Sequence, residues 1–191
     1  MITKIDEFIA RSFKTATEHG FHDEKTSYGH QMMLVVSEIG EAVEADRKCR
    51  HSQLAMFERE RNTPQAAEHV LKHFQFCFEQ FVKDTVEDEM ADVCIRLFDM
   101  CGYFNVVPYC SKTEIESLRD DWKEAFGDMS FCEQAFCLVN LLCDDDANVT
   151  FGTSLAFIYY WSQHHGIDLV RHIKLKMQYN ESRGYKHGKK Y

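Results

Sequence analysis

Two short stretches of the chain each place two carboxylates three residues apart within an otherwise apolar run. The first holds Glu38 and Glu41, and the second holds Glu89 and Asp92. Because an α-helix advances about 100° per residue, side chains at this spacing share a helix face. Acids on a mostly apolar helix face either solvent or each other, and acids that face each other need a cation to stay ionised. The two motifs therefore predict two helices whose acids either face solvent or face each other around a cation.

The rest of the chain carries helical patterns almost throughout. Two prolines and nine glycines favour long helices over many turns. Residues 47–62 are basic and polar, which predicts a surface segment, and Asp144–Asp146 predict a solvated loop. No run shows the alternation of a strand, so the sequence predicts an all-α fold. The expected helices span residues 3–19, 30–48, 64–81, 85–104, 111–126, 130–143, 153–165 and 168–183.

Several helix starts carry capping signals. Pro64 follows Thr63 at a first helical position, and Asp84 or Thr85 is expected to cap the second acidic helix. Capping boxes begin at Ser111 and Ser130, each with a glutamate three residues later.

Composition excludes some classes of function. The net charge of −9 argues against a general surface for nucleic-acid polymers. Eight cysteines occur without a C-x-x-C pair, and several lie in apolar helical patterns, which favours reduced thiols in the cytoplasm. The N-terminus lacks the pattern of a signal peptide and no stretch of 18 apolar residues occurs, so we expect neither secretion nor a membrane span.

The four carboxylates allow a plain and a specific interpretation. One such pair alone is most simply the solvated face of an amphipathic helix. Two matched pairs on apolar helices instead favour a shared cation site inside a bundle. Oxygen ligands alone favour Mg²⁺ or Mn²⁺. A ferritin-like di-iron centre is opposed by the absence of an E-x-x-H motif beside the acids.

The two acidic stretches together resemble a known family. Residues 33–47 and 87–99 are similar to the E-x-x-E and E-x-x-D motifs of MazG-like nucleotide pyrophosphohydrolases, an all-α family that includes dimeric dUTPases and dCTP pyrophosphatases. The basic run at 174–189 resembles the ending of many small members. The resemblance covers roughly residues 1–48, 84–104 and 168–191, and implies a MazG-like helical bundle.

Two departures from the family pattern predict extra helices. The motifs are further apart than is usual, which marks residues 48–83 as an insertion, and residues 111–165 have no counterpart in the family core. We therefore expect one domain over residues 1–191, with these two insertions and a basic tail at 184–191.

The resemblance implies hydrolysis of a nucleoside triphosphate at the α-phosphorus, giving a monophosphate and pyrophosphate. By position, Glu38, Glu41, Glu89 and Asp92 would bind Mg²⁺, or Mn²⁺, and Glu38 or Glu41 would act as the catalytic base. Family members are usually homodimers or homotetramers, so an oligomer is expected. The preferred base and sugar stay open, including dUTP and dCTP.

The basic C-terminal region has two interpretations. Its cations either complement the end of a helix or bind the β- and γ-phosphates. The candidates for phosphate binding are Lys176, Asn180, Arg183 and Lys186.

Two further expectations concern the surroundings of the acids. Arg96 and Asp99 are expected to pair with each other. The candidate walls of a nucleobase slot lie before the first acidic helix, at Phe21, His22, Tyr28 and His30.

Two other functional classes remain open. The chain would be a nucleotide or metal sensor if it binds nucleotide without turnover, although no acid of the motifs is missing. It would be a helical interaction module if residues 48–83 and 111–165 form a partner surface; that class predicts no stabilisation by Mg²⁺ and nucleotide.

Overall fold

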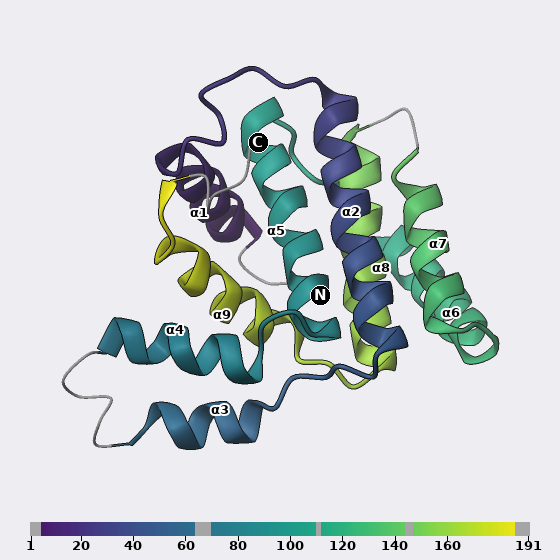
Figure 1. Cartoon of the computed structure of the whole chain (residues 1–191). Helices are drawn as coiled ribbons and strands as arrows, with labels where there is room; N and C mark the ends of the chain where they lie inside the picture. Colours follow the sequence, from purple (N-terminus) through teal and green to yellow (C-terminus); the bar gives the residue numbers. More distant parts are fainter. Residues whose placement is uncertain (1–4, 64–69, 110–111, 144–146, 186–191) are drawn as a thin grey trace.

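A computed structural model describes residues 5–63, 70–109, 112–143 and 147–185, with only the backbone of residues 112–115. Every regular element within these ranges is a helix, and none of them is a strand (Figure 1). The predicted all-α fold is confirmed.

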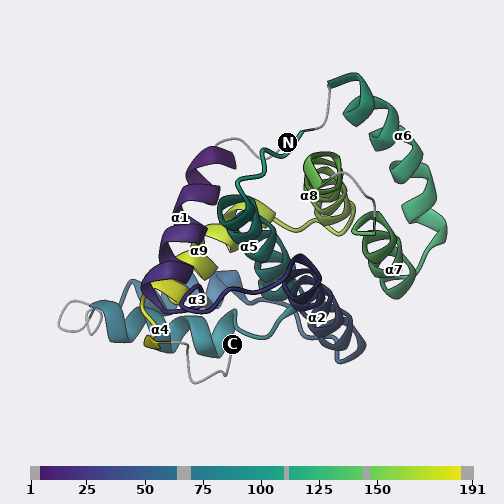
Figure 2. The same ribbon diagram turned by 90° about the horizontal axis from the view of Figure 1, so that it is seen from above.

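The centre of the molecule is α5 (Val86–Phe104), which is surrounded by α1 (Ile5–Glu18), α2 (Tyr28–Arg47) and α9 (Leu169–Glu181). Figure 2 looks close to the axis of α5 and shows these three helices around it. Most of α5 is buried, including its acidic first turn. A helix buried on nearly all sides must hold its charged groups in pairs or clusters, and these are the candidates for a functional site.

A small helical hairpin, α3 (Leu54–Arg61) and α4 (Val70–Phe81), packs against α9 at one end of the molecule (Figure 1). Residues 47–62 are exposed or half-buried apart from Phe57, as expected for a surface segment. Phe57 has no exposed surface, and it packs edge-on against Phe74. One aromatic residue among charged neighbours gives too weak a periodicity to reveal the buried side of a two-turn helix.

A second layer consists of α6 (Lys112–Asp128), α7 (Phe131–Leu141) and α8 (Ala147–His164). The innermost of these, α8, contacts α5, whereas α6 and α7 lie outside it (Figure 2). The apolar face of α8 joins the main core, with Trp161 only 1 % exposed. The helices of residues 48–83 and 112–164 thus lie on two different sides of the α1–α2–α5–α9 group.

Caps fix the ends of the central helix. Thr85 caps α5, because its hydroxyl accepts a hydrogen bond from the backbone N–H of Asp88. The preceding residue, Asp84, has a left-handed backbone with φ of 58°, and Asn105 ends the helix with φ of 54°. Both residue types tolerate this conformation better than most.

The capping box at Ser130 and Glu133 is confirmed. The expected signals at Pro64 and Ser111, and the loop Asp144–Asp146, lie outside the described residues. Among the helices of the described ranges, none combines the length and the hydrophobicity needed to cross a bilayer.

Candidate metal site and adjoining pocket

The packing of α2 on α5 brings three acidic side chains into one cluster. Glu38, Glu89 and Asp92 each offer an oxygen, and these oxygens all lie within 4.8 Å of one another. Glu38 and Glu89 are only 5 % and 4 % exposed, while Asp92 is half-buried. Three of the four acids predicted as metal ligands therefore meet in space.

The fourth predicted acid, Glu41, does not belong to this cluster. Its side chain is exposed on the following turn of α2. It nevertheless lies close enough to Glu89 for its charge to help raise the pKa of that carboxyl. Glu41 thus borders the cluster from the solvent side, and its expected role as a ligand or base stays a prediction.

Burial changes the acidity of Glu89. Removal from water raises its pKa from about 4.5 to about 8, because the charged form loses its hydration. The nearby ammonium of Lys176 acts in the opposite direction, and the charges of Asp92 and Asp88 add to the increase. A carboxyl that resists ionisation in this way gains a counter-charge when a cation binds beside it.

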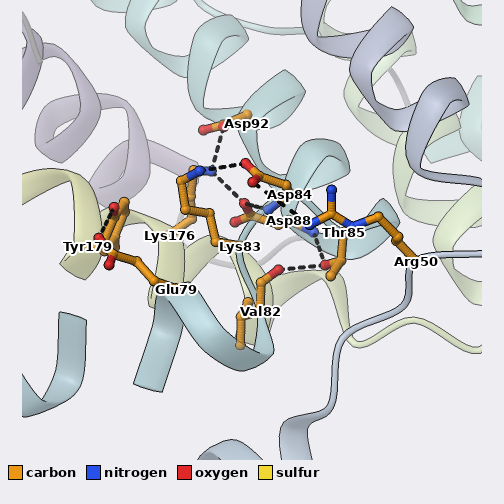
Figure 3. Close-up of polar contacts among 10 residues, drawn as sticks. All are labelled: Arg50, Glu79, Val82, Lys83, Asp84, Thr85, Asp88, Asp92, Lys176 and Tyr179. Atoms are coloured by element: carbon orange, nitrogen blue, oxygen red, sulfur yellow. Dashed lines mark hydrogen bonds and ion pairs between the residues drawn. The ribbon is translucent and has the colours of Figure 1, made fainter. Parts of the chain in front are cut away.

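A buried lysine from α9 enters the acidic region from the other side. The ammonium nitrogen Nζ of Lys176 lies 2.7 Å from Oδ2 of Asp88 and 2.7 Å from Oδ2 of Asp92. Figure 3 shows the Lys176 side chain reaching between these two acids. Burial acts to lower the pKa of Lys176, but the surrounding carboxylates outweigh it and raise the pKa. Lys176 therefore stays charged, and Asp88 is its most buried partner.

The E-x-x-D motif does not include Asp88, which directly precedes its first acid. Asp88 is 1 % exposed, and burial raises its pKa even though Lys176 opposes that effect. Its Oδ2 accepts the backbone N–H of Asp84 as well as the Lys176 ammonium. The one available signal was a run of three consecutive acids on an otherwise apolar helix.

Arg96 supplies a second cation to the cluster. Its Nε donates a hydrogen bond of 3.1 Å to Oε1 of Glu38. The expected pairing of Arg96 with Asp99 is replaced by this bond. Asp99 instead contacts Nε2 of His22, 3.1 Å from its Oδ1. Burial raises the pKa of Asp99, and the charges of His22 and Arg96 oppose that increase.

A pocket adjoins the acids between α1, α2, α5 and α9. It encloses about 690 Å³ of space including its open mouth. Glu38, Asp92 and Arg96 form one part of its wall. The remaining polar wall residues come from α1, the loop after it, α5, α9 and the segment after α9, and they are Ser12, Thr15, His19, Asp99, Asn180 and Arg183.

The predicted phosphate-binding residues are placed differently from one another. Asn180 and Arg183 line the pocket, and Oδ1 of Asn180 is buried without a hydrogen-bond partner among the described residues. Lys176 is committed to carboxylates rather than turned into the pocket. Lys186 lies outside the described residues. A phosphate-binding role for any of the four stays a prediction.

The four residues predicted to form the walls of a nucleobase slot do not all line the pocket. Phe21 lines the pocket, and His22 lies behind it, held by Asp99 and stacked on Phe13. Tyr28 packs against the aromatic ring of Phe104, and both are partly buried at the edge of the core. Neither Tyr28 nor His30 belongs to the pocket wall.

The donor set fits a hard divalent cation. Three carboxylates on two rigid helices offer oxygen ligands only, which suits Mg²⁺ or Mn²⁺ better than zinc. Arg96 and Arg183 line the neighbouring pocket, and arginine is a residue type that suits phosphate oxygens. Cation-assisted chemistry on a phosphorylated ligand is what this arrangement suits.

Comparisons of the chain with models of protein families, with curated proteins and with solved structures return no match.

Proposed function

We propose that the protein is a Mg²⁺-dependent hydrolase of nucleoside triphosphates, cleaving at the α-phosphorus to give a nucleoside monophosphate and pyrophosphate. The observation that carries the proposal is the Glu38–Glu89–Asp92 cluster at the edge of a pocket that also presents arginines. The seven cysteines of the described ranges are all free thiols, which suits a cytoplasmic enzyme.

Each part of the site has a role in this reaction. Glu38, Glu89 and Asp92 hold the cation, which supplies positive charge to the phosphate oxygens and lowers the pKa of a water molecule. Glu38 or the exposed Glu41 accepts the proton of the attacking water. Arg183 and Asn180 bind the phosphate groups, because they line the same pocket as Glu38 and Asp92.

The nucleoside is assigned to the part of the pocket that Phe21 and Ser12 line. Phe21 is an aromatic wall residue, and the hydroxyl of Ser12 is buried without a hydrogen-bond partner among the described residues. An apolar surface with a few polar groups is the usual composition of a nucleoside slot. The base and the sugar that this slot prefers are left to experiment.

The test is a turnover screen of all common NTPs and dNTPs with Mg²⁺, in which pyrophosphate and single-phosphate release are measured separately. The proposal expects pyrophosphate from the parent protein, and a loss of at least 100-fold in kcat in both Glu38→Gln and Asp92→Asn, the scale of removing a metal-assisted step. Glu44→Gln is the matched control, since Glu44 lies on the same helix but pairs with Arg47 and Lys48 at the surface.

Three outcomes would count against the proposal. Activity that survives in both variants would place the reaction elsewhere. Stabilisation by Mg²⁺ and a nucleotide without turnover would favour a sensor. No turnover together with no stabilisation would leave the interaction module. The expected homodimer or homotetramer is tested separately by light scattering.

A further inference from the structure

The carboxylate cluster already contains a cation of the protein's own. Lys176 is only 5 % exposed, and its ammonium contacts Oδ2 of both Asp88 and Asp92 at 2.7 Å (Figure 3). Its third side is closed by the ring of Phe78, whose centroid lies 5.8 Å from Nζ. A lysine enclosed by two acids and an aromatic ring cannot move into water without opening the contact between α5 and α9.

The charges around this lysine can be counted. Glu38, Asp88, Glu89 and Asp92 carry four negative charges when ionised, and Lys176 and Arg96, which form ion pairs with three of them, carry two positive charges. A net charge of −2 remains. One divalent cation balances that charge, whereas two would leave an excess positive charge in a largely buried region, which is unfavourable.

The positions of the acids also favour a single divalent cation. Asp92 belongs to the three-carboxylate cluster and also contacts Lys176, so it bridges the place for a metal ion and the place held by the ammonium. Asp88 lies on the far side of Lys176, and its Oδ1 is buried with no hydrogen-bond partner among the described residues. A second metal ion between Asp88 and Asp92 would have to take the position of Nζ.

We propose that Lys176 occupies the place of a second metal ion, so that the site binds a single divalent cation, Mg²⁺ or Mn²⁺, beside a permanent ammonium group. The inference rests on the proposed function in one respect, namely that the Glu38–Glu89–Asp92 cluster binds a metal. It assigns Lys176 to the carboxylates as a positioning residue for Asp92 instead of to the phosphates of the substrate.

The experiment counts bound Mn²⁺ on the full chain by electron paramagnetic resonance, without nucleotide. The signal of free Mn²⁺ in solution gives, by difference from the total, the number of ions bound per chain. The low-temperature spectrum distinguishes an isolated bound ion from a magnetically coupled pair. The parent protein is expected to bind one isolated Mn²⁺. Lys176→Met is expected to bind two coupled ions, because it vacates the position between Asp88 and Asp92. Lys83→Met, which removes a lysine paired with the surface residue Asp84, is the control and keeps one ion.

The outcomes separate this inference from the proposed function. Two coupled ions in the parent would overturn the inference and leave the metal-dependent function standing. No bound Mn²⁺ in the parent would overturn both. A folded Lys176→Met variant that still binds one ion would overturn the role given to Lys176. If that variant does not fold, the count for the parent protein decides.

Discussion

Arg96 on α5 holds Glu38 on α2, with its Nε 3.1 Å from Oε1 of the carboxylate. The contact joins the two helices that carry the acidic motifs, directly beside the pocket. The guanidinium offsets negative charge on Glu38 that the proposed metal ion would also need. We therefore expect Arg96 to compete with a bound metal ion for Glu38.

This competition predicts that Arg96→Met binds Mn²⁺ more tightly than the parent. Removing a positive charge next to a cation site relieves repulsion, and a tenfold fall in Kd corresponds to about 1.4 kcal/mol. Titration calorimetry without nucleotide measures the Kd for Mn²⁺ of the variant and of the parent. Arg47→Met is the control, because Arg47 pairs with Glu44 at the surface and its loss should leave Kd unchanged. An unchanged or higher Kd in Arg96→Met would mean that Arg96 positions Glu38 for the metal.

The two lysines shown in Figure 3 predict very different effects on stability. Lys176 and Lys83 each place Nζ 2.7 Å from an aspartate oxygen, but the side chain of Lys176 is 6 % exposed and that of Lys83 is 34 % exposed. Breaking a buried ion pair leaves an uncompensated charge, so Lys176→Met should lower the free energy of unfolding by about 3–5 kcal/mol. Lys83→Met should lower it by less than about 1 kcal/mol. Urea unfolding of both variants provides the comparison, and equal losses would contradict the burial argument.

The pKa of Glu89 predicts how stability depends on pH without metal. The carboxyl releases its proton near pH 4.5 in the unfolded chain but only near pH 8 in the folded protein. The folded state therefore binds more protons between these values, and stability falls as the pH rises through this range. The contribution of Glu89 is on the order of 4 kcal/mol. Urea unfolding in EDTA at pH 5, 6.5 and 8 should show a flatter profile for Glu89→Gln than for the parent, and parallel profiles would contradict the shift.

Much of the fold follows from local signals in the sequence. Thr85 predicts the start of α5, and Ser130 with Glu133 predicts the start of α7, because a cap depends only on residues within one turn. The meeting of Glu38 with Glu89 and Asp92 was also predictable, since matched acids on two apolar helices must face either solvent or each other. Periodicity alone, however, does not separate Glu41 from Glu38, although one is exposed and the other buried.

The partners of the acids were not predictable, because they depend on how helices far apart in the chain pack. Lys176 reaches Asp88 across 88 residues of sequence, and Arg96 reaches Glu38 across 58. A basic residue near the end of the chain looks the same whether it faces phosphate or a buried carboxylate. Only the packing of α9 on α5 shows that Lys176 belongs to the carboxylates.

Two glycines on the helices of the site predict opposite effects on stability. A Cβ at Gly102 of α5 would lie 2.5 Å from Cβ of Phe13 on α1, whereas a Cβ at Gly40 of α2 would meet nothing within 4 Å. Gly102→Ala should therefore force α1 away from α5 and lower the free energy of unfolding by about 1–3 kcal/mol. Gly40→Ala should raise it by about 0.5–1 kcal/mol, because alanine favours the helix. Urea unfolding with EDTA measures both.

A stabilising Gly102→Ala would mean that α1 and α5 pack less closely than the structure describes. A destabilising Gly40→Ala would mean that this exposed face of α2 is covered in solution, as it would be in the expected oligomer, and light scattering of the same variant would then show a change of mass.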